Sequence, residues 1–305
     1  LEAGVYYVRE ISAPTGYQLN TEIFKFNVGV AEAGSTAAPV WALTQTVTDA
    51  KRVYNVQLRK TAEDGATPLA GAEFRLTGGG FNLTATSGAD GYVTFSGLPF
   101  GSYTVTETKA PSGYALSPAV TVKVDGSNTP AVYAAGQTVN GGTVKDTHTR
   151  LTVLKVDDAN QNKGLPGTKF VIKSGNQFVT ATGANGAYSY TGLGDTGTEL
   201  VTGNDGRFTL EYLPLGSYTL TETAAPDGYI IVNADTAFRI TAAASSVTVG
   251  NTLIQAKLSI VKTDEYGKLL PGIGFTLHTA AGYVRATGNN GSYKYTGLGE
   301  KGTVL

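Results

Sequence analysis

Internal repetition is the feature that most constrains this chain, because an eight-residue motif, E-x-x-A-P-x-G-Y, occurs in it three times. We call the copies glutamate boxes; they occupy residues 10–17, 107–114 and 222–229. A stretch of alternating apolar and polar residues that includes a Tyr stands directly before each box. Self-similarity of this kind indicates an array of similar structural units rather than one large domain.

A second element also recurs, and its copies alternate with the boxes. It is an apolar stretch that ends in Lys, followed by a polar turn, a short L-[AP]-G sequence and another apolar stretch. Its three copies occupy residues 56–76, 151–172 and 258–277. Two separated elements that recur in the same order make chance similarity a poor explanation.

The order of the two elements divides the chain into four parts. We predict the back half of a repeat at 1–50, complete repeats at 51–150 and 151–256, and the front half of a further repeat at 257–305. These parts are called the first segment, repeat one, repeat two and the last segment. Repeat two contains an insertion at 175–198, which is similar to residues 281–303. Because position 1 is not Met, we expect a processed or excised piece of a longer protein.

The composition favours an all-β fold. The 305 residues include 40 Gly and 17 Tyr, and no long segment shows apolar residues at helical spacing. Four dipeptides are typical of hairpin turns: Asp90-Gly91, Asn185-Gly186, Asp205-Gly206 and Asn290-Gly291. Roughly seven short strands in about 100 residues predict a β-sandwich for each complete repeat.

Charge and cysteine content exclude several classes of function. The net charge is −1, which offers no basic surface for nucleic acid or an anionic membrane, and no run of about 18 apolar residues predicts membrane insertion. The absence of Cys rules out disulfides and cysteine catalysis. No metal or cofactor is expected, since residues 157–160 lack the spacing of a calcium loop and His148 and His278 read as lone surface residues.

Each Lys-terminated stretch places its Lys on the face that the strand should bury. Side chains alternate between the two faces of a strand, so Val56, Leu58 and Lys60 share one face. The same pattern recurs at Leu151, Val153 and Lys155, and at Leu258, Ile260 and Lys262.

The glutamate boxes and the ends of the repeats show the same alternation. The face of each strand before a box ends in a carboxylic acid, at Glu10, Glu107 and Glu222. Near the end of each repeat an apolar residue and a polar one share a face, in the pairs Val47 and Asp49, Val144 and Asp146, and Val249 and Asn251. Each complete repeat therefore directs one Lys, one Glu and one Asn or Asp into its core, where an unpaired charge costs several kcal/mol.

Amide formation would explain three buried polar residues per repeat. Desolvation lowers the pKa of a Lys and raises that of a Glu, so a neutral amine and a neutral acid become available. The amine would attack the side-chain carbonyl carbon of Asn or Asp while the Glu shuttles protons, and ammonia or water would leave. We predict the isopeptide bonds Lys60–Asp146 and Lys155–Asn251, with Glu107 and Glu222 as proton shuttles. The alternative is an unreacted buried ion pair, or a Lys that reaches solvent.

The spacing supports these acceptors in part. Glu10 and Glu107 each stand 39 positions before their Asp, whereas Glu222 stands 29 positions before Asn251. The shorter interval predicts a trimmed hairpin in front of Asn251.

At these motifs the sequence resembles the Cna-B (collagen-adhesin B-type, prealbumin-like) domains of Gram-positive pilins and surface adhesins. The residues that carry the resemblance are Lys60, Lys155 and Lys262, the L-[AP]-G turns, and the glutamates of the boxes. The resemblance covers essentially the whole chain. It implies tandem inverse immunoglobulin-like β-sandwich repeats, an isopeptide bond between first and last strands, and an extracellular, wall-anchored or polymerised location.

The predicted function is mechanical: a stalk or pilus-shaft segment whose partners are neighbouring repeats of the same protein or fibre. Self-cross-linking happens once per bond, so the chain is not expected to be an enzyme. The alternative is an adhesin module that binds host protein or glycan, which exposed aromatics such as Tyr188 and Tyr190 would favour. The end segments cannot bond internally; truncation of a longer array is the main interpretation, and pairing of Lys262 with Glu10 and Asp49 of another copy is the alternative.

Two local features have competing interpretations. The sequence LPGTK at 165–169 looks like a sortase signal, but it lies inside a repeat with no hydrophobic tail, so a turn is the better interpretation. Trp41, the single Trp, is assigned to core packing, with glycan stacking as the alternative.

Overall fold

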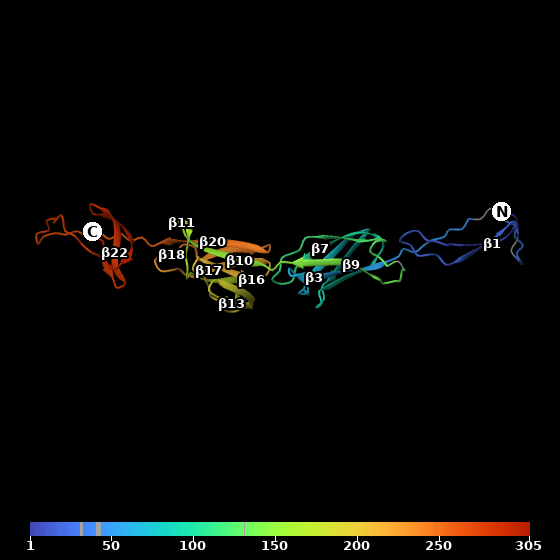
Figure 1. Cartoon of the computed structure of the whole chain (residues 1–305), viewed down its shortest axis with the longest axis horizontal. Helices are drawn as coiled ribbons and strands as arrows, with labels where there is room; N and C mark the ends of the chain where they lie inside the picture. The colour runs from blue at the N-terminus through green and yellow to red at the C-terminus, as the bar shows by residue number, and fades with distance from the viewer. Residues whose placement is uncertain (31–32, 41–43, 131) are drawn as a thin grey trace. The chain divides into compact units, whose positions relative to one another are not determined.

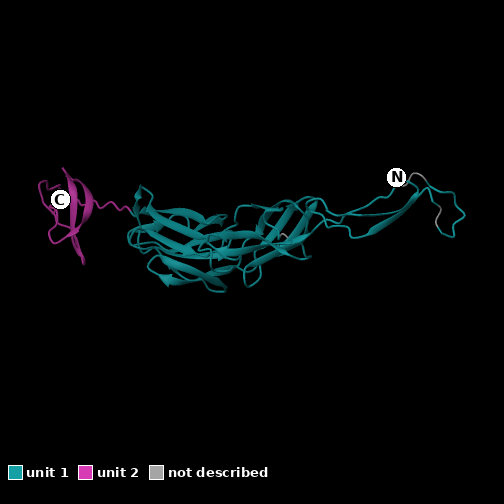
Figure 2. Cartoon of the chain, turned by 45° about the vertical axis from the view of Figure 1, so that its right-hand side comes forward, with its two compact units in different colours: residues 1–254 teal, residues 255–305 magenta. Residues whose placement is uncertain are grey.

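The computed structural model describes residues 1–30, 33–40, 44–130 and 132–305. The prediction for Trp41 lies outside the described residues. The chain forms two compact units, residues 1–254 and 255–305, which Figure 2 colours separately. Every regular element in the described ranges is a β-strand, which confirms the all-β prediction. Over the same residues, no helix has the length and apolar character needed to cross a membrane.

The first segment forms one hairpin-like pair. Strand β1 (Gly4–Arg9) lies antiparallel to β2 (Ile23–Val28), with Tyr6 opposite Phe26. The box between them ends in a turn, where the Tyr17 amide donates to the Pro14 carbonyl.

Repeat one is a sandwich of two sheets (Figure 1). The first sheet has the order β6-β3-β9, from the strands β3 (Tyr54–Ala62), β6 (Tyr92–Leu98) and β9 (Thr138–Asp146). The second has the order β5-β4-β7-β8, from β4 (Glu73–Gly78), β5 (Phe81–Thr86), β7 (Gly101–Lys109) and β8 (Val120–Val124). The first and last strands, β3 and β9, are neighbours and run parallel.

The core of repeat one follows from alternation along these strands. Val56 and Leu58 of β3 are buried on the same face as Lys60, and they meet Phe74 and Leu76 from the opposite sheet. Residues between them on the strand are only half-buried, as the period of two requires. Alternation in the sequence therefore decides which side chains enter the core.

Repeat two contains the same sandwich but joins its two sheets into one network of eleven strands. Its strands are β10 (Arg150–Asp157), β11 (Asn160–Gly164), β12 (Lys169–Ser174), β13 (Gln177–Ala184), β14 (Ala187–Gly194), β15 (Leu200–Val201), β16 (Arg207–Glu211), β17 (Gly216–Ala224), β18 (Tyr229–Ile231), β19 (Asp235–Ile240) and β20 (Ala244–Leu253). The predicted insertion forms the hairpin β13–β14. Strand β13 pairs with β12 of one sheet, while β14 pairs in parallel with β16 of the other.

The last segment lies in the separate compact unit of residues 255–305. It contains the short strand β21 (His278–Thr279) and the hairpin β22 (Gly282–Asn289) and β23 (Ser292–Gly299). Leu258 and Ile260, on the stretch that corresponds to β3 and β10, are exposed.

Two of the four predicted hairpin turns are confirmed and two are wrong. Asn185-Gly186 and Asn290-Gly291 connect paired strands, with positive φ at both residues of each dipeptide. Asp90-Gly91 instead links strands of two separate sheets, and Asp205-Gly206 links β15 and β16, which do not pair with each other. In these two turns only the Gly has positive φ, and the Asp side chain accepts from the backbone amide two residues later.

The boundary between repeats one and two is a set of close contacts. The Thr149 amide donates to the Gly113 carbonyl, and the Thr149 carbonyl accepts from the Tyr212 amide. His148, expected to be a lone surface residue, stacks on Tyr212 at 4.7 Å and lies 3.2 Å from a carboxylate oxygen of Glu63. The expectation was wrong because a sequence motif cannot show which loop of the next repeat meets it.

Candidate cross-linking sites

The predicted Lys and acceptor residues lie on neighbouring parallel strands. In repeat one, Lys60 of β3 is opposite Val144 of β9, and Asp146 follows two residues later. In repeat two, Lys155 of β10 is opposite Val249 of β20, and Asn251 again follows two residues later. Since residues i and i+2 share a face, this common register directs both side chains of each pair to the same side.

The glutamates approach from the opposite layer of each sandwich. Glu107 lies on β7, where its partner across the sheet is Phe74, and Glu222 lies on β17 opposite Phe170. A box therefore contributes its Glu at the end of a buried strand face and its A-P-x-G-Y turn directly afterwards.

All six side chains are buried. Lys60, Lys155 and Asn251 have an exposed fraction of 0%, and Glu107 and Glu222 have 3%. Asp146 has 1%. Neither Lys reaches solvent, so the charges of each cluster must be balanced within it.

In repeat two the three groups form a closed ring of hydrogen bonds. Lys155 Nζ donates to Asn251 Oδ1 at 2.7 Å and to Glu222 Oε2 at 2.8 Å, and Asn251 Nδ2 donates to Glu222 Oε1 at 2.6 Å. Lys155 Nζ also donates to the Gly250 carbonyl at 2.9 Å. Burial lowers the pKa of Lys155, which favours its neutral, nucleophilic form.

In repeat one the same positions hold a different set of contacts. Lys60 Nζ lies 3.0 Å from Glu107 Oε1 and is hydrogen-bonded to Asp146 Oδ1. Burial raises the pKa of Asp146 to about 7, and the negative charge of the neighbouring Glu107 carboxylate acts in the same direction. Lys60 Nζ also lies 5.6 Å from the centre of the Phe74 ring.

Two turns that the sequence analysis did not connect with the site hold the backbone of each Lys. The Lys60 amide donates to Gly91 at 2.7 Å and its carbonyl accepts from Leu69 at 3.0 Å. Gly206 and Leu165 make the same bonds to Lys155, at 2.8 and 2.9 Å. The recurring L-[AP]-G and Asp-Gly sequences were the available signal, because both follow each Lys in the same order, although the distance from the Lys to the Asp-Gly turn differs between the repeats.

The end segments hold only parts of such a site. Glu10 Oε2 accepts from the Asn20 amide at 2.6 Å, and Asp49 is half-buried. Lys262 is exposed, although its carbonyl accepts from Leu270 at 3.0 Å as in the complete repeats. The roles predicted for Glu10, Asp49 and Lys262 stay predictions.

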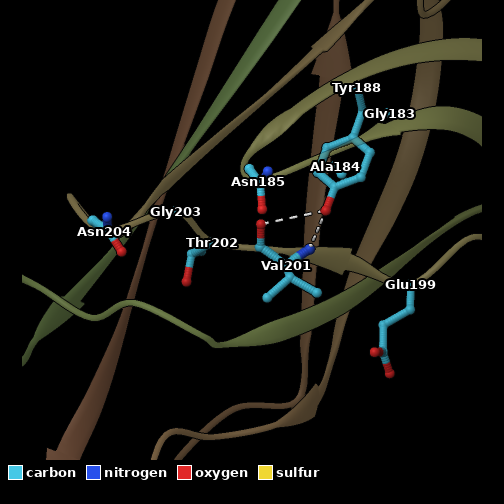
Figure 3. Close-up of a pocket in the computed structure, with 9 residues that line it drawn as sticks. All are labelled: Gly183, Ala184, Asn185, Tyr188, Glu199, Val201, Thr202, Gly203 and Asn204. Carbon is cyan, nitrogen blue, oxygen red and sulfur yellow. Dashed lines mark hydrogen bonds between the residues drawn. The ribbon is translucent and has the colours of Figure 1, made fainter.

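A surface hollow of about 480 Å³ lies beside the inserted hairpin (Figure 3). Its lining includes Asn185, Asn204 and Glu199, and the Tyr188 hydroxyl accepts from the Val201 amide at 3.0 Å. Tyr188 is only 7% exposed and Tyr190 packs against the core of repeat two. The structure therefore contradicts the exposed aromatic cluster that would favour an adhesin. Among the described residues, no group of three or more His, Asp or Glu is placed to hold a metal.

The fold and the buried clusters define a class of protein: tandem β-sandwiches with a Lys, a Glu and an Asn or Asp enclosed in each complete repeat. A family model described as the SpaA prealbumin-like fold domain matches residues 1–38, 54–138 and 149–253. These stretches make up most of the chain, so the chain belongs to this family. The predicted resemblance and the predicted fold are confirmed. No curated protein matches the chain.

Several solved structures are similar to the chain. The Bacillus anthracis TIE protein is 23% identical, with a TM-score of 0.42; the match covers 92% of this chain and 46% of that protein. A streptococcal ancillary pilin is 22% identical, with a TM-score of 0.32 and coverage of 84% and 77%. The shaft pilin SpaA from Lactobacillus rhamnosus GG is 22% identical, with a TM-score of 0.34 and coverage of 68% and 100%.

Proposed function

We propose that this chain is a structural segment of a bacterial surface stalk or pilus, stabilised by one self-formed isopeptide bond in each complete repeat. The observation that carries the proposal is the closed ring of Lys155, Glu222 and Asn251, buried and within hydrogen-bonding distance throughout. Family membership supports the structural role. Residues 51–150 and 151–256 are taken as the two cross-linked units.

The chemistry in repeat two follows from the ring. Glu222 takes a proton from Lys155, and the neutral amine attacks Cγ of Asn251. The new N–C bond replaces the bond to Nδ2, and Glu222 delivers the proton that lets Nδ2 leave as ammonia. The attacking nitrogen gives its second proton to Glu222, which ends as a neutral acid, and the amide retains one N–H. Folding holds the reacting groups together, which is worth up to about 7–11 kcal/mol of the barrier. Each bond forms once, so the process is self-modification without turnover.

The position of the bonds suits a mechanical role, in which tension passes through the covalent bond. Each would join the first strand of a repeat to its last, and the residues it encloses, 86 in repeat one and 96 in repeat two, could not be extended by tension. On the chain-entropy model for covalent cross-links, loops of this size gain roughly 4–5 kcal/mol. Resistance to heat and to proteolysis is expected to follow.

The partners proposed are neighbouring repeats of the same protein or fibre, and the proposed location is extracellular, on the wall or pilus of a Gram-positive bacterium. No cofactor is required, since the reacting groups are all side chains of the chain.

An adhesin role is the second candidate. The hollow beside β13–β14 is its only specific support, and the buried Tyr188 weakens it. Specific, saturable binding of a glycan or host protein to the full chain would favour it, and the comparison variant would carry Asn185→Ala and Asn204→Ala.

Intact mass spectrometry of the full chain under denaturing conditions tests the main proposal. A Lys–Asn bond removes ammonia, about 17 Da, and a Lys–Asp bond removes water, about 18 Da, so a total loss of about 35 Da is expected once proximity has driven both reactions. Glu222→Gln should retain only the loss of about 18 Da, and Glu107→Gln only that of about 17 Da.

Glu199→Gln is the matched control, because Glu199 is an exposed glutamate of repeat two outside the ring. It should leave both losses intact. A wild-type mass equal to that of the unmodified sequence would refute the proposal, as would full loss in the Glu107→Gln and Glu222→Gln variants.

A further inference from the structure

The two buried glutamates are held in different ways. In repeat two both oxygens of Glu222 accept from reacting groups, one from Lys155 and one from Asn251. In repeat one Glu107 Oε2 accepts from Ser117 instead: from its amide at 2.7 Å and from its hydroxyl at 2.8 Å. Ser117 lies in the loop between β7 and β8, ten residues after Glu107.

The first segment repeats the arrangement of repeat one. Glu10 Oε2 accepts from the amide of Asn20, which is also ten residues after the glutamate. In both places the sequence carries an Asp acceptor, Asp146 in one and Asp49 in the other. A hydrogen-bond donor from the loop therefore accompanies an Asp acceptor. It is present even in the first segment, whose described residues contain no counterpart of β3.

The corresponding position in repeat two does not act in this way, because no hydrogen bond joins it to Glu222 among the described residues. Ten residues after Glu222 stands Val232, which has no side-chain donor and is 53% exposed. The chain there has already turned toward β20, because β18 pairs with that strand and places Ile231 opposite Asn251.

A physical reason connects the donor with the acceptor type. An Asn acceptor has its own N–H, which points at the glutamate and fixes the orientation of its carboxyl plane. An Asp acceptor has no N–H, and Oδ2 of Asp146 makes no hydrogen bond to Glu107 among the described residues, so the two facing carboxyls are free to turn. Hydrogen bonds from Ser117 to Oε2 of Glu107 therefore replace the hydrogen bond that the amide of an Asn acceptor would donate to the glutamate.

We propose that Ser117 is a positioning residue for the Lys60–Asp146 bond: its two donors hold Glu107 Oε2, so that Oε1 is the atom that moves the proton between Lys60 and Asp146. This inference rests on the cross-linking function proposed above. Oε1 faces Lys60 at 3.0 Å, and Oε1 of Glu107 and Oδ2 of Asp146 are buried without another hydrogen-bond partner among the described residues.

The proton balance closes with Glu107 in this role. Lys60 starts as an ammonium, Glu107 as a carboxylate and Asp146 as a carboxylic acid, so the buried cluster is neutral. Oε1 takes one proton from Nζ, the amine attacks Cγ of Asp146, and the C–O bond of the hydroxyl breaks. One further proton from the attacking nitrogen completes the water that leaves, and Glu107 ends as a neutral acid. The amide retains one N–H.

The test follows the two bonds separately in the full chain. Pulse-labelled chain from cell-free translation is quenched in denaturant at intervals, digested, and the two cross-linked peptides are quantified by mass spectrometry. The rate at which the Lys155–Asn251 bond forms is the internal reference, because it reports on folding of the same chain. Ser117→Ala should slow formation of the Lys60–Asp146 bond by roughly tenfold, because a hydrogen bond to a charged group is lost. It should leave the rate of the Lys155–Asn251 bond unchanged. Ser117→Thr, which keeps the hydroxyl, should restore the rate.

Exchanging the acceptor Asp146 for Asn distinguishes a positioning role of Ser117 from a general contribution of Ser117 to the stability of the fold. In an Asp146→Asn background, Ser117→Ala should change the rate by less than about twofold, because the amide orients Glu107 itself. Equal slowing in the Asp and Asn backgrounds, an unchanged rate for Ser117→Ala alone, or failure of the Asp146→Asn chain to cross-link would overturn the inference. If wild-type repeat one never loses water, the proposed function itself fails, which is a distinct result.

Discussion

Repeats one and two place a Lys, a Glu and an acceptor at the same three points of the same sandwich, yet the contacts around the glutamate differ. In repeat two the acceptor is an amide and closes a ring with Glu222. In repeat one it is a carboxyl, and Glu107 relies on Ser117. The strand framework brings the three groups together in both repeats, and on the proposal above the acceptor type determines what else the glutamate needs.

The two repeats also differ greatly outside the site. Repeat two joins its sheets through β13–β14, and repeat one does not. The link from β8 to β9 spans residues 125–137, whereas the link from β19 to β20 spans only 241–243. This short link accounts for the closer spacing of Glu222 and Asn251. The site tolerates both changes because its position depends on the parallel pairing of first and last strands.

Loss of the bond itself should produce the largest effect. Lys60→Met and Lys155→Met keep an apolar stem of similar length but remove the nucleophile. We expect each to lower the free energy of unfolding of its own repeat by roughly 4–5 kcal/mol, the loop-closure contribution of the cross-link. Hydrogen exchange of β3 and β10 peptides, followed by mass spectrometry across a denaturant series, reports on the two repeats separately.

The reciprocal repeat is the control in each variant. If Lys60→Met weakened β10 as much as β3, the bonds would not act within single repeats. If neither variant changed protection, the contribution of a covalent bond would be excluded.

The glycines of the Asp-Gly turns provide the next test. Gly91 has a φ of 79° and Gly206 one of 75°, and a Cβ at either position would collide with the carbonyl of the Lys proposed as the nucleophile, Lys60 or Lys155. Gly91→Ala and Gly206→Ala should each destabilise their repeat by about 1–3 kcal/mol and slow its cross-link. Thermal unfolding and the peptide assay described for Ser117 measure the two effects.

Gly71 and Gly167 are matched controls. They too have positive φ, at 80° and 74°, but a Cβ would meet nothing within 4 Å. Gly71→Ala and Gly167→Ala should show the smaller backbone penalty and an unchanged rate. Equal slowing by turn and control variants would mean that the contact with the Lys backbone is irrelevant.

The sequence was sufficient to predict much of this fold and the membership of the site. Alternation with a period of two placed Lys60, Glu107 and Asp146 on buried faces, and repetition showed that they belong together. The period identifies a face but not a partner in space. Even so, one repeat has a single small core, so three polar residues that recur on its buried faces are expected to lie close together.

What the sequence could not show depends on contacts between loops and strands distant along the chain. Ser117 has no motif, because a serine ten residues after a glutamate is common and its role depends on how the loop folds back. His148 was read as a surface residue because nothing in its neighbourhood in the sequence indicates Tyr212. Asp90-Gly91 resembles a hairpin turn locally, and only the sheet order shows that its flanking strands separate.

The two repeats also differ in that the acceptor of repeat one, Asp146, titrates, whereas Asn251 of repeat two does not. The pKa of Asp146 is about 7 in the fold against an ordinary value of 3.8, so between these values the folded chain binds a proton that the unfolded chain does not. An uncross-linked repeat one should therefore lose stability as the pH rises from about 4 to about 7. Lys60→Met provides that state, and removal of the lysine takes away an interaction that lowers the pKa. Chemical denaturation across this range measures the slope.

Repeat two and the cross-linked wild type are the comparisons for this slope. Asn251 does not titrate, so repeat two of Lys155→Met lacks this contribution, and a formed Lys60–Asp146 amide has no carboxyl left to protonate. Equal slopes for repeat one in the wild type and in Lys60→Met would contradict either the bond or the raised pKa.

The smallest effects are expected from ion pairs that both repeats carry on their surfaces. Lys109 lies 3.1 Å from Glu73 in repeat one, and Lys169 lies 2.9 Å from Glu199 in repeat two, with all four side chains well exposed. Lys109→Ala and Lys169→Ala should each change the free energy of unfolding by about 0–1 kcal/mol, because solvent screens such pairs. Both cross-links should form at the normal rate. A larger loss in either variant, measured by the same exchange experiment, would show that stability of these repeats does not reside mainly in the buried clusters, since Lys60 and Lys155 differ from Lys109 and Lys169 chiefly in burial.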